Sequence, residues 1–302
     1  MNKILVIGSL NADLVVRAPR FPSPGETIQG DNLVTIPGGK GANQAVASAR
    51  LGAQVAMIGR VGGDSFGATL INNLKQNKVD ANQVIEDSSS ATGTAVIVVD
   101  SQGQNSIILS PGANAKVALS DISPGSFSGY SLLLLQLEIP IETVIHSAKL
   151  AREKGLLVLL NPAPAHNLPE DLLKTADYIL PNETELGLLT GKPVKDLASV
   201  SEACRSLLAH GAKNIIVTLG PQGALIVNKD GMKLIPSFKV NVVDTTAAGD
   251  AFIGGLAVGL LNGKSLEDAV QYACACGALA VTKFGAQPSL PTAEDVNGII
   301  NK

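Results

Sequence analysis

The chain is poor in aromatic side chains, charged side chains and cysteine. Of its 302 residues, 3% are aromatic and 16% are charged, and the net charge is −3. Because there is no long basic run, neither nucleic acid nor an anionic membrane is expected as the main partner, which favours small substrates. The cysteine count is odd, at 3, and Cys274 and Cys276 share an apolar run, which indicates buried thiols rather than disulfides or a zinc site.

Membrane and metal signals are missing as well. No stretch reaches the roughly 18 apolar residues needed to cross a bilayer, and the apolar run in Met1–Leu10 ends at Gly8, too early for a signal peptide. No His-Glu-x-x-His, paired-cysteine or EF-hand pattern occurs, so a structural metal held by the protein alone is not expected. We therefore expect a soluble, cytoplasmic protein.

The common nucleotide-binding motifs are also absent. No Gly-x-Gly-x-x-Gly occurs, and Pro37–Gln44 is not a Walker A loop, because Val34 stands where that motif needs Gly and no Ser or Thr follows Lys40. Pro37–Gln44 is instead a glycine-rich turn that opens a helix. Gly39 would let a ligand approach the backbone, while Lys40 and Asn43 supply donors suited to sugar hydroxyls. On this stretch alone, a simple helix-starting turn is the alternative.

Gly63–Gly67 matches the Gly-x-Ser-x-Gly nucleophile elbow of hydrolases. Three downstream histidines would be the candidate bases: His146, His166 and His210. An elbow needs its serine directly after a strand, but Gly59–Gly63 intervene here. The pattern therefore favours Asp64 or Ser65 as an ordinary helix cap.

Short apolar runs alternate with helical segments along most of the chain. The runs expected to form strands are Ile4–Ile7, Val55–Ile58, Leu132–Leu137, Leu156–Leu160, Tyr178–Leu180 and Ile215–Leu219. The helical segments are Ala42–Leu51, Phe66–Lys75, Ile141–Lys154, Glu183–Leu189 and Ser201–His210. This alternation predicts an α/β fold with a doubly wound, mostly parallel sheet and helices on both of its faces.

Two segments, Leu14–Ile36 and Thr94–Leu109, break this rhythm by alternating apolar and polar residues. They predict a small antiparallel sheet that serves as a lid. The expected division is therefore a core of residues 1–13, 38–93 and 111–302, with a lid of residues 14–37 and 94–110. An exposed lid sheet could also pair with a second subunit to form a homodimer.

Polar residues follow several of the expected strands. In an open parallel sheet, ligands bind beyond the carboxyl ends of the strands, so these residues should share one rim. They are Asn11, Asp13, Glu138, Asn182, Glu185, Thr218 and Gly220.

Val243–Phe252 indicates a helix N-terminus built to face an anion. Its Asp-Thr-Thr start offers capping side chains, Gly249 leaves room for a phosphate oxygen, and an apolar helix is expected over Ala251–Leu261. Asp250 would repel a phosphate, which favours a role as the base that deprotonates an attacking hydroxyl. A helix-capping role for Asp250 is the alternative.

Together these stretches resemble the ribokinase family of carbohydrate and nucleoside kinases over nearly the whole chain. Pro37–Gln44 and Asp244–Asp250 look like the two family signatures, and Asn182–Glu185 is similar to its Asn-x-x-Glu motif. Four further segments resemble the ribose-specific members: Asn11–Asp13, Gln136–Glu138, Asn161–Ala165 and Gly285–Ser289. The resemblance implies transfer of the γ-phosphoryl group of ATP to the 5-hydroxyl of D-ribose, in ribose catabolism.

The resemblance also implies the site residues. Ribose would be held by Asn11, Asp13, Gly39, Lys40, Asn43 and Glu138, with Asp250 as the base. The anion hole would be Ala247, Ala248 and Gly249. ATP would lie near Asn182, Thr218, Gly220, Gly223, Gly249 and Cys274, where many relatives have Asn or His in place of this thiol. Mg²⁺ would be carried on the phosphates and held through water by Asn182 and Glu185.

An activating monovalent cation, K⁺ or a similar ion, is implied in the same way. The segment Lys283–Ser289 contains Gly285 and Pro288 and cannot continue the preceding helix, so its carbonyls become free. The implied ligands are the side chains of Asp244 and Ser289 and the carbonyls of Thr246, Ala280, Lys283 and Gly285. Without the resemblance, an inert turn is the alternative.

Two other functions are weighed against a ribose kinase. Another sugar or nucleoside kinase of the same family is the nearer one, although a nucleoside would need an aromatic surface for its base and aromatic residues are scarce. A sugar-binding sensor without catalysis is the remote one, and it finds no support because Asp250 and Gly249 are both present.

Overall fold

A computed structural model describes residues 3–301. Its main sheet has nine strands in the order β13-β12-β11-β10-β9-β8-β1-β4-β5. They are β1 (Lys3–Ile7), β4 (Gln54–Gly62), β5 (Val79–Asp87), β8 (Leu132–Leu135), β9 (Leu157–Leu160), β10 (Tyr178–Ile179), β11 (Asn214–Thr218), β12 (Ala224–Asn228) and β13 (Gly231–Ile235). The first seven of these pair in parallel, while β12 and β13 add an antiparallel edge.

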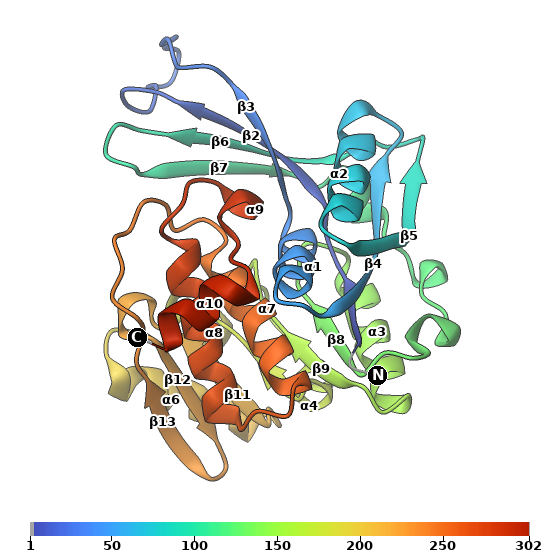
Figure 1. Cartoon of the computed structure of the whole chain (residues 1–302), viewed down its shortest axis with the longest axis vertical. Coiled ribbons are helices and arrows are strands. Elements are labelled where there is room, and N and C mark those ends of the chain that lie inside the picture. Colours follow the sequence, from blue (N-terminus) through green and yellow to red (C-terminus); the bar gives the residue numbers. More distant parts are fainter. Residues whose placement is uncertain (1–2, 302) are drawn as a thin grey trace.

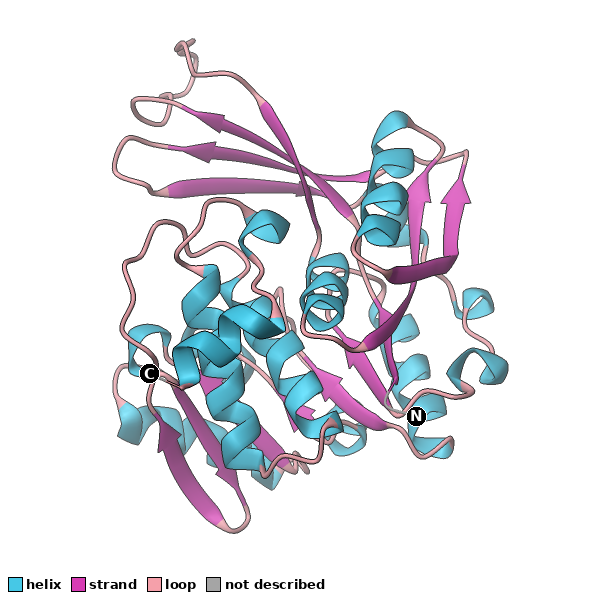
Figure 2. Ribbon diagram, in the orientation of Figure 1, coloured by secondary structure: helices cyan, strands magenta, loops and turns pink. Residues whose placement is uncertain are grey.

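Helices cover both faces of this sheet (Figures 1 and 2). Strand β1 shows why, because Ile4 and Val6 belong to one apolar cluster and Leu5 and Ile7 to the other. On the Ile4 side pack α1 (Lys40–Arg50), α2 (Ser65–Gln76), α7 (Ala248–Leu261), α8 (Leu266–Ala280) and α10 (Ala293–Ile300). On the Leu5 side pack α3 (Ile141–Glu153), α4 (Glu170–Thr175), α5 (Glu183–Thr190) and α6 (Leu197–Ala209). The predicted fold class is confirmed.

The chain winds outward from β1 in two directions. It runs through β4 and β5 to one edge, returns to β8 on the other side of β1, and continues through β9 to β13. The strand order therefore reverses at β1, and the crevice beyond the carboxyl ends of β1 and β8 is where such sheets bind ligands.

A second sheet, which we call the lid sheet, has the order β3-β2-β6-β7 and extends over the short helix α9 (Ala286–Ser289) in Figure 1. Its strands are β2 (Asn11–Arg17), β3 (Val34–Gly38), β6 (Gly93–Val99) and β7 (Asn105–Ser110). The expectation that all its strands pair antiparallel was wrong at one place, because β2 and β6 pair in parallel. Each of these two strands leaves the core after a parallel strand of the main sheet, so both run outward in the same direction.

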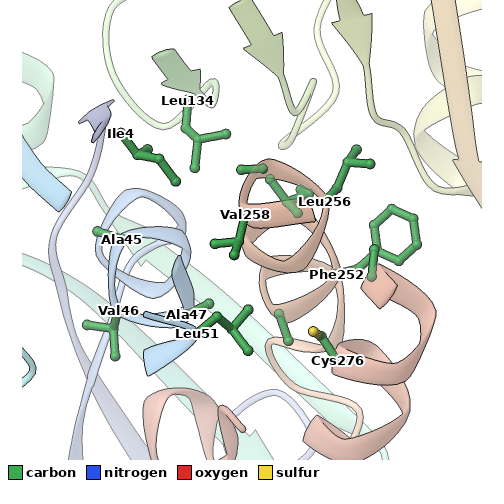
Figure 3. Packing of buried hydrophobic residues seen from close by; sticks show 14 of the residues in the cluster. Ile4, Ala45, Val46, Ala47, Leu51, Leu134, Phe252, Leu256, Val258 and Cys276 are labelled. Atoms are coloured by element: carbon green, nitrogen blue, oxygen red, sulfur yellow. The ribbon is translucent and has the colours of Figure 1, made fainter. Parts of the chain in front are cut away.

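Helices α1 and α7 pack closely against each other (Figure 3). A Cβ atom at Gly254 would lie 2.7 Å from the Ala47 Cβ, so this approach needs glycine. Close packing brings the first turns of the two helices together, and these turns carry Asn43, Gln44 and Asp250.

Other features also follow the sequence. All three cysteines are buried and free, as predicted. Asp64 caps α2 by accepting from the Gly67 N–H, as expected of a helix cap. Within residues 3–301, no helix is both long and apolar enough to cross a membrane.

Candidate active site

Two helix starts form the floor of the crevice. Helix α1 begins after Gly39, whose φ is 88° and whose added Cβ would lie 2.7 Å from the Asn11 nitrogen. Helix α7 begins after Ala247, which has the left-handed φ of 59°, unusual for a residue with a side chain. The first N–H groups of α1 are already occupied, because Lys40 donates to Glu138, and Gly41 and Ala42 donate to Ser9. At α7, Ala247 provides no side-chain cap, so within the described part of the chain the N–H groups of Gly249 and Asp250 are left for a ligand.

Helix α7 starts three residues earlier than predicted, at Ala248, which places Asp250 within its first turn. The expected capping by Asp-Thr-Thr was wrong, because Asp244 instead accepts from the N–H groups of Thr246 and Gly285. A Cβ atom added to Gly249 would meet no protein atom within 4 Å. The start of α7 therefore leaves open space where a phosphate could approach.

Asp250 is buried, with 7% of its surface exposed. Its Oδ2 accepts from Asn43 Nδ2 at 3.0 Å, and its Oδ1 accepts from Gln44 Nε2 at 3.0 Å. Burial raises the pKa of Asp250, while Lys40 and these two amides oppose the rise. Within residues 3–301, the Oδ1 of Asn43 is buried without a hydrogen-bond partner, which leaves an acceptor for a ligand hydroxyl.

A cluster of charged groups lies beside Asp250. Burial, Glu138 and Asp250 raise the pKa of Asp13 to about 7. Burial by itself would lower the pKa of the Lys40 amine, but three carboxylates outweigh it and raise that pKa. These carboxylates are Asp250, Glu138 and Glu185. The cluster thus gathers acceptors and one cation of the kind that bind sugar hydroxyls.

Backbone and side-chain bonds hold this cluster in place. Glu138 Oε2 accepts from the Lys40 N–H at 3.0 Å and from the Ser9 hydroxyl. The Asp13 carboxylate lies against Gly38, where an added Cβ would come within 2.1 Å of Oδ2. These contacts join the end of β1, the start of β2 and the first turn of α1.

A cavity of about 580 Å³ lies on the other side of the α7 start. Its lining includes all the residues expected near ATP: Asn182, Thr218, Gly220, Gly223, Gly249 and Cys274. The buried Cys274 thiol has its pKa raised to about 12 by burial, so it lines the cavity as a neutral group. Phe252 and Phe238 add apolar surface.

Asn182 and Glu185 already have a structural task. They form a capping box at the start of α5, in which each side chain accepts from the other's backbone N–H at 2.8 Å. One carboxylate oxygen of Glu185 takes no part in that bond. Burial raises the pKa of Glu185, and Lys40 and Asp250 lie near enough to influence it.

The residues expected around the cation lie where α8 ends and α9 begins. Asp244 links the Thr246 loop to Gly285, because one of its carboxylate oxygens accepts from the Thr246 N–H and the other from the Gly285 N–H, each at 2.9 Å. Burial by itself would raise the pKa of Asp244, but the Thr246 hydroxyl, which also donates to it, and these two N–H groups lower it. Lys283 donates its N–H to the Ala280 carbonyl, and the Ser289 hydroxyl donates to the Ala286 carbonyl at 2.7 Å.

Sequence analysis missed Asn114, which lies between two alanines with no local motif. Its side chain bonds the N–H and the carbonyl of Leu10 and donates to Asn11 Oδ1 at 2.7 Å. The Asn11 amide therefore has its oxygen occupied and its NH₂ group left for a ligand. No feature of the sequence near Asn114 indicates this role.

Two ligand-binding regions that meet at the start of one helix define the protein as an α/β enzyme that brings two substrates together. The model of the pfkB family of carbohydrate kinases matches residues 1–293. The chain belongs to this family, so the predicted family membership and carbohydrate kinase activity are confirmed.

Relatives cover the full length of the chain. A ribokinase of Haemophilus influenzae is 43% identical over 298 residues, which are 98% of this chain and 97% of that protein. A deoxyribokinase of Salmonella typhi is 40% identical over 297 residues, 97% of each. The solved structure of Arabidopsis thaliana ribokinase complexed with ribose and ATP has a TM-score of 0.93 and 34% identity, and the match covers both chains completely.

Proposed function

We propose that this protein transfers the γ-phosphoryl group of ATP to the 5-hydroxyl of D-ribose, giving ribose 5-phosphate and ADP. The observation that carries the proposal is the place of Asp250, in the first turn of α7 between the charged cluster and the 580 Å³ cavity. A sugar hydroxyl beside Asp250 would lose its proton to the carboxylate as it attacks a phosphate at the α7 N–H groups. The similarity to ribokinases supports ribose as the acceptor.

In this proposal each group of residues has one task. Asn11, Asp13, Gly39, Lys40, Asn43 and Glu138 bind the sugar. Ala247, Ala248 and Gly249 stabilise the charge that develops on the transferred phosphoryl group. The nucleotide occupies the second cavity, and Mg²⁺ is carried on its phosphates, with Asn182 and Glu185 reached through water.

A 2-deoxyribose kinase is the second candidate, because a deoxyribokinase is 40% identical, within the range of 36% to 43% found for ribokinases. The test is to measure ADP release with ATP, Mg²⁺ and a panel of D-ribose, 2-deoxyribose, hexoses and nucleosides. The highest kcat/KM with ribose is expected. A higher kcat/KM with another sugar would identify that sugar as the substrate in place of ribose. If no compound of the panel causes ADP release, the protein would be a non-catalytic sugar sensor.

We propose further that residues 14–37 and 94–110 move as a lid over the core formed by 3–13, 38–93 and 111–301. The groove beneath the lid sheet, about 840 Å³, runs from Asp13 to Asp244 and remains open. Closure would exclude water from the transferred phosphoryl group. Hydrogen exchange in β2, β3, β6 and β7 should slow when ribose is added, whereas protection confined to the core would contradict the lid.

An activating K⁺ ion is proposed beside the α7 start. Asp244 already holds the Thr246 loop against Gly285, so an ion there would fix the backbone that precedes the anion hole. A carbonyl cage suits a large, weakly hydrated cation. Turnover in buffer balanced with a bulky organic cation should rise when K⁺ is titrated in, and less with Na⁺. A flat response would refute the site, and undiminished activation of Asp244→Ala would place the ion elsewhere.

A homodimer through the lid sheet is proposed from an apolar row on its outer face. Leu14, Val96 and Ile108 lie in register across β2, β6 and β7, and Ile108 is 70% exposed. Ile108→Glu should shift the protein from dimer to monomer in light scattering, because it places a charge in the buried interface. Leu188→Glu, at a 65% exposed position on α5, is the control. Equal masses for the parent and Ile108→Glu would contradict this interface.

The cytoplasmic location expected from the sequence stays a prediction.

A further inference from the structure

A chain of buried amide groups ends on the Asp250 carboxylate. Gln44 donates through Nε2 to Asp250 Oδ1 at 3.0 Å and to Asn161 Oδ1 at 3.2 Å. Its Oε1 accepts from Gln136 Nε2 at 2.6 Å. Gln44 and Gln136 are fully buried and Asn161 is 6% exposed, so water does not compete for these bonds.

The two ends of this chain fix the orientation of every amide in it. Asn161 Nδ2 donates to the Leu180 carbonyl at 3.0 Å, and a carbonyl can only accept. The Asn161 oxygen therefore faces Gln44, and Gln44 must donate to it through its NH₂ group. If Gln44 were reversed, its oxygen would face both the Asn161 oxygen and the Asp250 carboxylate, which would place acceptors against acceptors in a buried site.

Gln136 completes the arrangement at a cost. Its NH₂ group satisfies the Gln44 oxygen, but its own Oε1 is buried without a partner within the described part of the chain. The backbone beside it is Gly8, where an added Cβ would lie 2.0 Å from that oxygen. An unsatisfied buried acceptor is unfavourable, and the fold tolerates it here while the Gln44 amide keeps its orientation.

We propose that Gln44, locked by Asn161 and Gln136, is a positioning residue that holds the Asp250 carboxylate unprotonated and aimed at the sugar hydroxyl. The proposal deepens the proposed function, because it assumes Asp250 as the base. Asn43 also donates to Asp250, but its oxygen is available to a ligand, and its amide is not part of the chain that fixes the orientation of Gln44. The side-chain hydrogen bonds of Gln44 all go to neighbouring protein groups.

The groups that bear on the Asp250 charge come from several elements. Lys40 from the start of α1 and the amides of Asn43 and Gln44 favour the ionised form. Burial, which is the largest influence, and the Glu138 carboxylate, which follows β8, disfavour it. The carboxylates of Asp13 on β2 and Glu185 on α5 also repel the Asp250 charge. Removing the Gln44 donor takes one of the stabilising groups away, so the pKa of Asp250 should rise. Since the base acts in its ionised form, the acid limb of the kcat profile should then move to higher pH.

The test compares Gln44→Leu and Gln44→Glu with the parent protein and with Gln136→Leu. Gln44→Leu should lower kcat at pH 7 by about 10-fold to 100-fold, the scale on which a misplaced catalytic group slows a reaction. The KM for ribose should change by a few-fold at most, and turnover should recover as pH rises. Gln136→Leu has equal burial and does not touch Asp250, so it should act in the same direction but less.

A second readout separates this proposal from the assignment of the base. The Asp250 carboxyl can be titrated by NMR in protein with ¹³C-labelled aspartate, and its signal is the one lost in Asp250→Asn. A higher Asp250 pKa in Gln44→Leu shows that Gln44 holds the carboxylate ionised, whatever the turnover of Asp250→Asn. Undiminished turnover of Asp250→Asn would overturn the base, and with it the catalytic purpose of this contact. An unmoved pKa and acid limb, or equal effects of Gln44→Leu and Gln136→Leu, would overturn the role of Gln44. Gln44→Glu keeps the size of the side chain and serves if the leucine variant fails to fold. It turns an acceptor oxygen toward Asp250, so it should also raise the Asp250 pKa, and an unmoved pKa in this variant would likewise overturn the role of Gln44.

Discussion

Asp250→Asn is expected to lower kcat by about 10²-fold to 10⁴-fold, the usual contribution of a general base. The amide has the size of the carboxylate, but it cannot take a proton from the sugar hydroxyl. Its NH₂ group would also face the donors of Asn43 or Gln44, which now point at Asp250 from both sides. We therefore expect turnover to fall while the two helix starts remain packed together.

The measurement is a steady-state assay at saturating ATP and ribose, with ribose affinity determined by calorimetry. Ribose affinity within about tenfold of the parent, together with an unchanged thermal unfolding temperature, would show that the loss of turnover lies in the chemical step. Asp171→Asn is the matched control, because its carboxylate is exposed and pairs with Lys149 on the surface. Turnover of Asp250→Asn within a few-fold of the parent would eliminate Asp250 as the base.

The main sheet could be predicted where its strands are buried on both faces. The run at Ile4–Ile7 is a continuous apolar segment and Ile215–Leu219 is interrupted only by Thr218, and these runs form most of β1 and β11. Strand β5 was missed because Val79–Asp87 is an edge strand with polar residues between its apolar ones. Strand β13 was missed because Gly231–Ile235 is largely exposed and lacks the pattern of a buried strand. Strand β12 was overlooked although Ala224–Asn228 begins with four buried apolar residues, which is the pattern of such a strand.

The site was predictable only as far as its residues carry local signals. Strand ends and glycine-rich turns pointed to Asp13, Lys40 and Asp250, which the fold brings into one charged cluster. The contacts that tune them join distant positions: Gln44 and Asp250 are 206 residues apart, and Gln44 and Asn161 are 117 apart. A pattern in one segment holds no information about such a bond, so the amide chain becomes visible only once α1, α7 and β9 are packed.

The second large effect is expected at the sugar site, where Asp13→Ala should raise the KM for ribose much more than the KM for ATP. Asp13 is 8% exposed and faces the groove beneath the lid sheet, so sugar hydroxyls bonded to it would leave water on binding. Without the Asp13 carboxylate these hydroxyls would have no hydrogen-bond partner, which should weaken ribose binding by about 1 to 3 kcal/mol and raise the KM for ribose about 5-fold to 150-fold. Asp31→Ala is the control, because Asp31 lines the same groove but is exposed.

The same carboxylate should make ribose affinity depend on pH. Burial first, then Glu138 and Asp250, raise the pKa of Asp13 to about 7, so near neutrality it is partly protonated in the free protein. Ribose hydroxyls donate to the ionised form and favour it, so binding should release a proton and affinity should rise as pH increases through 7. Calorimetry in buffers of different ionisation enthalpy measures that release, and Asp13→Asn should abolish it. If the parent binds ribose equally well at pH 6 and pH 8 and releases no proton, there are two explanations. Either Asp13 is already ionised in the free protein, or it does not contact the sugar. Equal KM changes for ribose and ATP in Asp13→Ala would show that Asp13 does not contact the sugar.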